Sequence, residues 1–558
     1  MSKNLSELSG RKGLKNNLFD ELGKLSIATG SPDKVALEKA AEEFLVGKAN
    51  TYGTASFYDF MREDNRGKKV YVCNGSACLC AGTQEGLTQE LEKHYKKEEI
   101  GEMCCLGRCH ENSAFFLDGK NYSAKSSTEI AQIVSQGRQN GVQGNEDDYH
   151  ISCHGEQVLT KPFSDIDTYY NLLLSMIERG ADACLEDIKD SNIRGRGGAG
   201  FPMWIKLDGC RKEPNGQKFI VCNADEGDPG AYTDRYLLEK QPHSVLFGMM
   251  VAGFITGADY GAVYIRAEYP ESIETVENAI KDLYAKGWLG ENIKGTGFNY
   301  NFKVIKAQGA YICGEETALL NSIEGQRPEV RVRPPYPVVQ GLFNRPTIVN
   351  NVETLAAVHY ILSKGGKHYA SIGRGKSTGT KLLSLDSHFN QPGLYEVDMG
   401  TPLATVVNDL AGGFKKPVKA LHIGGPLGGL VPMHKIADLT IDFESFAEEG
   451  FLLGHASILC VPEGFPMIQY LEHLFAFTSH ESCGKCFPCR LGAKRGAEMF
   501  QKAQKEDYKI DRTLLNDLIH TMEVGSLCAL GGGVPLPIRN GLQYFEEELK
   551  GFLSPIEN

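Results

Sequence analysis

Four cysteines in the last part of the chain have the types and spacing to hold a metal cluster. Cys483, Cys486 and Cys489 form a C-x2-C-x2-C run, and Cys528 follows between segments with helical patterning. Thiolates this closely spaced on one loop can occupy three corners of an iron–sulfur cubane, while a distant cysteine closes the fourth. Zinc is the alternative, but structural zinc more often uses two separated cysteine pairs or includes histidine. The spacing predicts a [4Fe–4S] cluster.

A glycine-rich stretch, RGRGGAGFP at residues 194–202, could bind a nucleotide. Glycines leave the backbone N–H groups free to close on a phosphate or on the flat face of a ring. Gly195, Gly197 and Gly200 also satisfy G-x-G-x-x-G, but a Rossmann fingerprint needs a strand immediately before it. Because residues 185–192 are polar and charged, we reject the Rossmann interpretation. A tight surface turn is the alternative to a nucleotide loop.

Composition limits the classes of protein that the chain can represent. A length of 558 residues predicts roughly three or four domains. The net charge of −12 argues against nucleic acid or an anionic membrane as the main partner. The most apolar run, residues 245–258, is too short to span a membrane, and the first residues have no apolar core typical of a signal peptide. We therefore expect a cytoplasmic protein whose 16 cysteines are cluster ligands and buried thiols.

The elements that must position these residues differ along the chain. Residues 18–67 have helical periodicity, and a strand, cysteine loop, helix and second strand follow over residues 68–120, as in half of a thioredoxin-like domain. Residues 137–148 have the composition of a linker. Strands such as KFIVCN and GAVYIR alternate with helices in the central region, which predicts an α/β domain. Short strands follow over residues 379–442, and the last segment is helical.

Four blocks of sequence carry a resemblance to a known family. RGRGGAGFP, CNADEGDPGAYTDR (222–235), GAYICGEETALLNSIEG (309–325) and NRPTIVNNVETL (344–355) resemble the flavin-binding, NADH-oxidising subunit of respiratory complex I. The same pattern is found in the diaphorase subunits of NAD-linked hydrogenases and formate dehydrogenases. The resemblance implies an NAD-dependent oxidoreductase with FMN, NAD(H), a [4Fe–4S] cluster and a [2Fe–2S] cluster.

The resemblance also implies an α/β multidomain fold with five parts. These are an N-terminal helical region (1–67), a thioredoxin-like [2Fe–2S] domain (68–140), an FMN- and NADH-binding α/β domain (149–370), a ubiquitin-like, soluble-ligand-binding domain (371–445) and a helical [4Fe–4S] domain (446–558). For the ubiquitin-like domain we favour a bare spacer over a ligand site.

A second set of cysteines matches the ligand spacing of the thioredoxin-like [2Fe–2S] family. Cys73 and Cys78 form C-x4-C, and Cys105 and Cys109 form C-x3-C, so the resemblance implies that they bind a [2Fe–2S] cluster. Cys104 is an alternative to Cys105, and Cys80 is a spare thiol. The alternative to a cluster is a scaffold with reduced thiols. The single cysteines, expected to pack as small apolar side chains, are Cys184, Cys210, Cys222, Cys313 and Cys460.

The cofactor-binding residues follow from the resemblance, position by position. For FMN it implies Gly195, Arg196, Gly197, Lys206, Asn223, Asp225, Glu226, Asn350 and Asn351. Beside the isoalloxazine and nicotinamide it implies Tyr311, Gly314, Glu315 and Glu316, with Phe201 and Tyr336 stacking on adenine. Asp228 is a further expected cofactor-binding residue near this site. Glu226 and Glu315 are the two expected to act in catalysis. Asp228, Arg333, Tyr336 and residues 207–209 depart from the complex I pattern, which affects the adenine pocket.

The partner is a separate question. The thioredoxin-like and flavin units are fused here, whereas complex I generally carries them as separate subunits. The motif SLCALGG at residues 526–532 resembles the formate dehydrogenase form, so we expect a hetero-oligomer with a molybdenum or tungsten formate dehydrogenase subunit. The alternative is the diaphorase subunit of an NAD-linked hydrogenase, with an iron–sulfur-containing hydrogenase partner, or a complex I-like NADH dehydrogenase. A cofactor-free scaffold is the interpretation from a different class.

Overall fold

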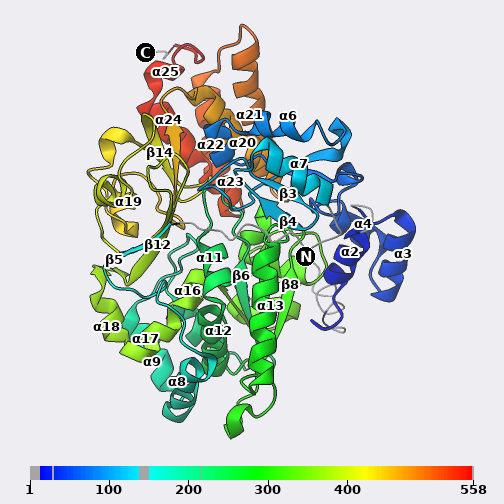
Figure 1. The fold of residues 1–558 in the computed structure, drawn as a ribbon, viewed down its shortest axis with the longest axis vertical. Coiled ribbons are helices and arrows are strands. Elements are labelled where there is room, and N and C mark those ends of the chain that lie inside the picture. Colours follow the sequence, from blue (N-terminus) through cyan, green and yellow to red (C-terminus); the bar gives the residue numbers. More distant parts are fainter. Residues whose placement is uncertain (1–9, 11–12, 28–30, 137–149, 215, 556–558) are drawn as a thin grey trace.

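A computed structural model describes residues 10, 13–27, 31–136, 150–214 and 216–555. The predicted linker, residues 137–148, lies outside the described residues. The described residues of the first part include helices α2 (Leu18–Ile27), α3 (Lys34–Glu43) and α4 (Lys48–Ala55). They lie at one edge of the molecule, coloured dark blue in Figure 1. Helix α3 begins where the Asp33 side chain accepts a hydrogen bond from the Ala36 N–H, a typical N-cap.

A small sheet with the strand order β2-β1-β3-β4 follows. Strand β1 pairs with β2 in parallel and with β3 in antiparallel orientation. Apolar side chains from β1, β3 and helices α6 and α7 form its core. The elements are β1 (Val70–Cys73), α5 (Ser76–Ala81), α6 (Gln84–Leu91), β2 (Ile100–Met103), β3 (Phe115–Leu117), β4 (Lys120–Tyr122) and α7 (Ser127–Gln136). This arrangement is the predicted thioredoxin-like part.

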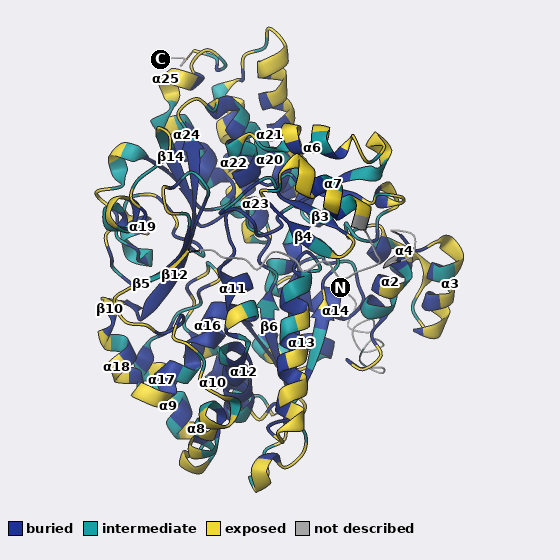
Figure 2. Ribbon diagram, viewed as in Figure 1, coloured by how far each residue is buried: buried dark blue, intermediate teal, exposed yellow. Residues whose placement is uncertain are grey.

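The central region is built on a four-stranded, fully parallel sheet with the order β8-β7-β6-β9. Helix α12 packs against β6 and β7 and is buried along most of its length (Figure 2). It contains most of the apolar run 245–258, and among the described helices none could cross a membrane. The strands are β6 (Phe219–Ala224), β7 (Tyr260–Ile265), β8 (Asn301–Lys306) and β9 (Thr347–Asn351). The helices around them are α8 (Ile166–Arg179), α9 (Ala181–Ser191), α10 (Met203–Lys212), α11 (Thr233–Lys240), α12 (Pro242–Thr256), α13 (Pro270–Ala285), α14 (Glu316–Ile323), α15 (Pro337–Gln340), α16 (Val352–Ala356), α17 (Val358–Lys364) and α18 (Gly366–Ser371).

A six-stranded mixed sheet has the order β15-β14-β16-β12-β13-β5. Strand β5 pairs with β13 and β16 lies between β14 and β12, so strands on both sides of residues 371–445 complete this sheet. The unit predicted for 371–445 therefore extends beyond that range in the structure. Its strands are β5 (His150–His154), β12 (Thr380–Leu385), β13 (Gly393–Asp398), β14 (Val418–Ile423), β15 (Gly429–Pro432) and β16 (Ser457–Pro462), with α19 (Phe443–Glu448) at one end.

The last segment is helical, as predicted. Helices α20 and α21 pack along each other, and α22 packs on α21. They lie at the top of Figure 1, in orange and red, above the parallel sheet. The helices are α20 (Met467–Glu481), α21 (Phe487–Lys505), α22 (Arg512–Gly525), α23 (Ala529–Gly533), α24 (Pro535–Tyr544) and α25 (Glu546–Leu549).

Candidate functional site

The four N-terminal cysteines meet at one end of the small sheet. Cys73 ends β1, Cys78 lies in α5, and Cys105 and Cys109 lie in the loop after β2. The Sγ atoms of Cys105 and Cys109 are 3.4 Å apart, and Cys73 lies close enough to Cys78 and Cys105 for both thiols to affect its pKa. All four side chains are buried. The structure therefore brings the complete predicted set together.

Backbone N–H groups already point at these sulfur atoms. The Gly230 N–H, from the end of the acidic stretch 222–230, donates to Cys109 Sγ at 3.2 Å. Hydrogen bonding with Cys109 lowers the pKa of Cys105, but the hydrogen bond with Cys73 and burial outweigh it and raise that pKa to about 12. Cys104 is less buried than Cys105, and its Sγ lies beside Gly75. Of the two alternatives, the geometry favours Cys105 as the ligand.

The second cysteine set also converges. Cys486 directly precedes α21, Cys489 lies in its first turn, and Cys528 directly precedes α23. Cys483 and Cys489 both act electrostatically on Cys528, so the distant cysteine lies beside the C-x2-C-x2-C run. The N-terminus of α21 favours negative charge on Cys486. Burial raises the pKa of Cys528 to about 12 and, as its largest cause, that of Cys489 to about 11.

The loop around Cys528 fits closely against Cys489. A Cβ on Gly531 would lie 2.5 Å from Cys489 Cβ and 3.1 Å from its Sγ, so only glycine allows this approach. Ser526 Oγ is buried and has no hydrogen-bond partner among the described residues, which leaves its hydroxyl free to donate to a cluster sulfur. Lys485, which lies between Cys483 and Cys486 in the sequence, has its Nζ 3.8 Å from a carboxylate oxygen of Glu329.

The glycine stretch lies between two helices, not after a strand. Helix α9 precedes it and α10 follows, so the rejection of a Rossmann fingerprint is confirmed. A Cβ on Gly197 would come within 3.0 Å of the Asn351 side chain. Arg196 does not line an open site. Its buried guanidinium donates to the Thr378 carbonyl at 2.6 Å and to the Tyr369 hydroxyl at 3.2 Å. Its backbone N–H donates to Thr354 Oγ1 at 2.9 Å, while its Nη1 is buried without a partner among the described residues.

Two asparagines lie side by side at the carboxyl edge of the parallel sheet. The register pairs Asn223 of β6 with Asn351 of β9, and Asn350 precedes it. Asn223 donates to the Gly314 carbonyl at 2.8 Å, whereas the Asn350 amide nitrogen is buried without a partner among the described residues. Ligands of open α/β sheets bind at this edge. An unused buried donor there fits a cofactor that supplies acceptors, as FMN does.

The acidic stretch is not a solvated turn. The Asp225 side chain is 2% exposed and lies 3.7 Å from Arg266. The Glu226 carboxylate accepts hydrogen bonds from the Asp234 N–H at 3.0 Å and the Arg235 N–H at 3.1 Å, so it caps α11. This carboxylate therefore acts on the helix and is not presented as a free catalytic group.

Asp228 connects to two other parts of the chain. Tyr311 donates its hydroxyl to Asp228 at 2.6 Å, and His455 Nε2 lies 3.0 Å from the other oxygen. His455 precedes β16 and was not predicted. Because the sequence separates it widely from the four blocks, no spacing signal could have found it.

Glu315 and Glu316 have different surroundings. Glu315 caps α14 by accepting from the Thr317 N–H, so its carboxylate, like that of Glu226, is occupied by backbone donors. Glu316 accepts from Lys206 at 3.1 Å and from Arg333 at 3.2 Å. Lys206, Tyr311, Gly314 and Glu316 thus gather near Asn223 and Asn351, as the resemblance implies.

The remaining predicted residues are aromatic or lone cysteines. Phe201 and Tyr336 expose 46% and 56% of their surface, so both rings are available for stacking. All five single cysteines are buried. This confirms the prediction that they pack as small apolar side chains.

Family models match three segments of the chain. Residues 17–138 match a thioredoxin-like [2Fe–2S] ferredoxin, residues 188–360 the Nuo51 FMN-binding domain, and residues 469–551 the NADH-ubiquinone oxidoreductase-F iron–sulfur binding region. The F 2 subunit of NADH-quinone oxidoreductase in Rhizobium meliloti is 38% identical over 70% of this chain and 92% of its own length. The chain belongs to the F-subunit family of NADH-quinone oxidoreductases.

Two further relatives are linked to hydrogenases. The HndC subunit of NADP-reducing hydrogenase in Solidesulfovibrio fructosivorans is 42% identical over 65% of this chain and 74% of its own. A chain in the crystal structure of an NAD+-reducing [NiFe]-hydrogenase in the H2-reduced state superposes with a TM-score of 0.85, at 28% identity, over 97% of this chain and 94% of the other.

This member of the F-subunit family is therefore an NAD-dependent oxidoreductase module with FMN and two iron–sulfur clusters. Flavin accepts two electrons as hydride and releases them one at a time, which is the chemistry needed between NADH and clusters. The residues present fit these groups: eight thiols form two clusters of ligands, and unused donors lie at Asn350 and Ser526. The protein supplies binding, orientation and charge.

Proposed function

We propose that this chain is the NAD-facing subunit of a formate dehydrogenase and passes electrons between NAD(H), FMN and the clusters. The observation that carries its electron-transfer role is the hydrogen bond from Gly230 to Cys109, because it joins the acidic stretch directly to a predicted cluster ligand. The pairing with formate dehydrogenase rests on the motif SLCALGG at residues 526–532. A cytoplasmic location stays a prediction from the sequence.

We infer that specific residues hold the flavin and NADH. The glycine stretch at Gly195, Arg196 and Gly197, together with side chains at the sheet edge, would bind FMN, and two exposed aromatic rings would stack on adenine. The edge residues are Lys206, Asn223, Asn350, Asn351, Tyr311, Gly314 and Glu316, and the aromatic residues are Phe201 and Tyr336. The carboxylates of Glu226 and Glu315 position α11 and α14 in this proposal, since both accept from backbone N–H groups.

A hydrogenase partner is the second candidate. One chain of the NAD+-reducing [NiFe]-hydrogenase aligns with 97% of this chain, including the thioredoxin-like part. By contrast, the relative from Rhizobium meliloti aligns with 70% of it. This correspondence over almost the whole chain is the observation that favours a hydrogenase as the second candidate.

The test is to purify the protein with its native partners and to measure NAD+ reduction with formate and with hydrogen. Reduction by formate with a molybdenum or tungsten subunit in the preparation supports the proposal. Reduction by hydrogen with a nickel–iron subunit supports the second candidate. The iron and flavin contents of the same preparation test the third interpretation, because a cofactor-free scaffold would contain neither iron nor flavin.

A further inference from the structure

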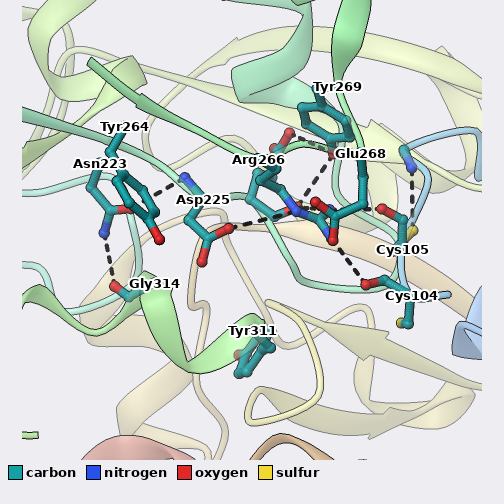
Figure 3. Close-up of polar contacts among 12 residues, drawn as sticks. Cys104, Cys105, Asn223, Asp225, Tyr264, Arg266, Glu268, Tyr269, Tyr311 and Gly314 are labelled. Atoms are coloured by element: carbon teal, nitrogen blue, oxygen red, sulfur yellow. Dashed lines mark hydrogen bonds and ion pairs between the residues drawn. The ribbon is translucent and has the colours of Figure 1, made fainter. Parts of the chain in front are cut away.

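Arg266 directly follows β7 and bears a guanidinium group that is buried between the two predicted cofactor loops. The whole residue is 1% exposed. Its Nη2 donates to the Cys104 carbonyl at 2.9 Å, and its Nη1 donates to the Cys105 carbonyl at 2.7 Å (Figure 3). Arg266 thus holds the backbone of the cysteine loop at the ligand Cys105.

The same nitrogen also reaches the acidic stretch. Nη1 donates to the Glu226 carbonyl at 2.7 Å, so one atom of Arg266 bridges Cys105 and Glu226. The Tyr269 ring packs against the guanidinium, whose Cζ lies 5.1 Å from the ring centroid (Figure 3). A compact lysine ammonium could not make this planar fork of contacts with three carbonyl groups.

The charges around Arg266 are few and buried. Its Nη2 lies 2.9 Å from Glu268, and its Nε lies 3.7 Å from Asp225. The Asp225 and Glu268 side chains are each 2% exposed, so this region is removed from water, and burial raises the pKa of both carboxyl groups. Electrostatic interactions are stronger in such surroundings than in water. A cation at this position therefore has a strong electrostatic effect on a nearby group whose charge changes.

A second contact joins the same segment to the cluster domain. Asn121 of β4 donates its side-chain N–H to the Glu268 carbonyl at 2.6 Å. The residues after β7 therefore form a contact with the thioredoxin-like domain, and Arg266 is the positively charged residue in this contact.

We propose that Arg266 is a positioning residue that fixes the [2Fe–2S] ligand loop against the flavin loop and that its charge raises the reduction potential of the cluster. A reduced cluster carries one more negative charge, so a buried cation held on the Cys105 backbone stabilises the reduced form. This inference deepens the proposed electron-transfer function and rests on it, but it holds for either partner.

The experiment is a mediated redox titration of the full chain, followed by electron paramagnetic resonance. Arg266→Met should lower the [2Fe–2S] potential enough to reduce the equilibrium constant for its reduction about tenfold, which is about 59 mV for a one-electron couple. Arg266→Lys keeps the charge and should shift the potential less. The [4Fe–4S] potential of the same sample is the internal reference and should stay unchanged.

Glu268→Gln tests the same idea with the opposite sign and keeps the arginine. Removing the negative partner should raise the [2Fe–2S] potential, so this variant remains informative if Arg266→Met does not assemble a cluster. Arg512→Gln is the matched control, because Arg512 also donates to a backbone carbonyl (Ser554, 2.8 Å) and pairs with a carboxylate (Glu546, 3.1 Å). It should change neither potential.

Unchanged [2Fe–2S] potentials in both Arg266→Met and Glu268→Gln would overturn the inference, as would equal shifts of both clusters. Chemical mediators set the potential in this titration, so the result does not depend on NADH. Failure of NADH to reduce the clusters in the unmodified protein would instead overturn the proposed function. The two failures are therefore distinguishable.

Discussion

His455 and Asp228 form a partly buried ion pair that joins the six-stranded sheet to the acidic stretch. His455 Nε2 lies 3.0 Å from Asp228, whose other oxygen accepts the Tyr311 hydroxyl at 2.6 Å. Burial alone would raise the pKa of Asp228, but the charge of His455 and these hydrogen bonds hold it below its ordinary value. Burial lowers the pKa of His455, but Asp228 outweighs burial and raises it above its ordinary value.

This pair predicts how stability depends on pH. The contribution of a histidine with a raised pKa is complete below its unfolded value of about 6.5 and is lost as pH rises through its folded value. The contribution of Asp228, whose pKa is lowered, is present above about 3.9 and is lost as pH falls. Glu226 supports the charged histidine and Lys381 opposes it. The pair should therefore stabilise the protein most between about pH 4 and 6.5.

His455→Gln should lower the free energy of unfolding by about 1.5–3 kcal/mol in that range, because Asp228 loses its charged partner. The measurement is the thermal midpoint of the cofactor-loaded protein from pH 5 to 9, with the exposed His94→Gln as the control. The difference from the unmodified protein should shrink toward pH 9. A difference of equal size at every pH would contradict the role of the ion pair.

The two adjacent cysteines predict opposite results when each is replaced by serine. Cys105→Ser should abolish the [2Fe–2S] signal in electron paramagnetic resonance, because Cys105 Sγ lies 3.4 Å from Cys109 Sγ and Cys105 is buried beside the other predicted ligands. Cys104→Ser should keep the signal and the iron content. If Cys104→Ser instead loses the cluster and Cys105→Ser keeps it, the assignment is reversed.

Local spacing predicted the [4Fe–4S] ligands, because C-x2-C-x2-C places three thiols on a single loop, whereas the [2Fe–2S] ligands were implied by the family resemblance. Cys528 lies beside Cys489 because of the way the helices between them pack, but the family pattern already indicated that Cys528 is the fourth ligand. Arg266 and His455 could not be predicted in this way. Each lies at the end of an ordinary strand or loop, and only the packing of separate domains brings it to Glu226 or Asp228.

The roles of charged residues were harder to predict than their positions. The resemblance places the acidic stretch at the cofactor, and a solvated turn was the less favoured alternative. The N-terminus of α11 lies close enough to take the Glu226 carboxylate, which the sequence does not reveal. Likewise β5, with the polar sequence HISCH, joins the sheet only because β13 offers a free edge.

Gly531 predicts a steric requirement at the second cluster. Gly531→Ala should lower [4Fe–4S] occupancy strongly, because the new methyl group would lie 2.5 Å from Cys489 Cβ and 2.5 Å from Ser526 Oγ. The control is Gly532→Ala on the same helix, whose Cβ would approach nothing closer than 3.4 Å. Iron content and the [4Fe–4S] signal measure the effect. Equal occupancy in the two variants would contradict this requirement.

Glu226 predicts an effect on the flavin site through α11. Glu226→Ala should remove the cap at the Asp234 and Arg235 N–H groups and destabilise the protein by about 1 kcal/mol or more. Because Gly227 and Asp228 follow directly, NADH oxidation and FMN retention should fall several-fold, while both cluster signals remain.

Asp165→Ala separates this local effect from a general loss of stability. Asp165 caps α8 in the same way, by accepting from the Thr168 N–H at 2.9 Å, but its side chain lies at the exposed start of another helix. NADH oxidation with an artificial acceptor and FMN release should therefore change in Glu226→Ala and not in Asp165→Ala. If the two variants lose equal activity at equal stability, Glu226 acts only as a generic helix cap. Glu226→Gln, which keeps one acceptor oxygen, should fall between Glu226→Ala and the unmodified protein in both measurements.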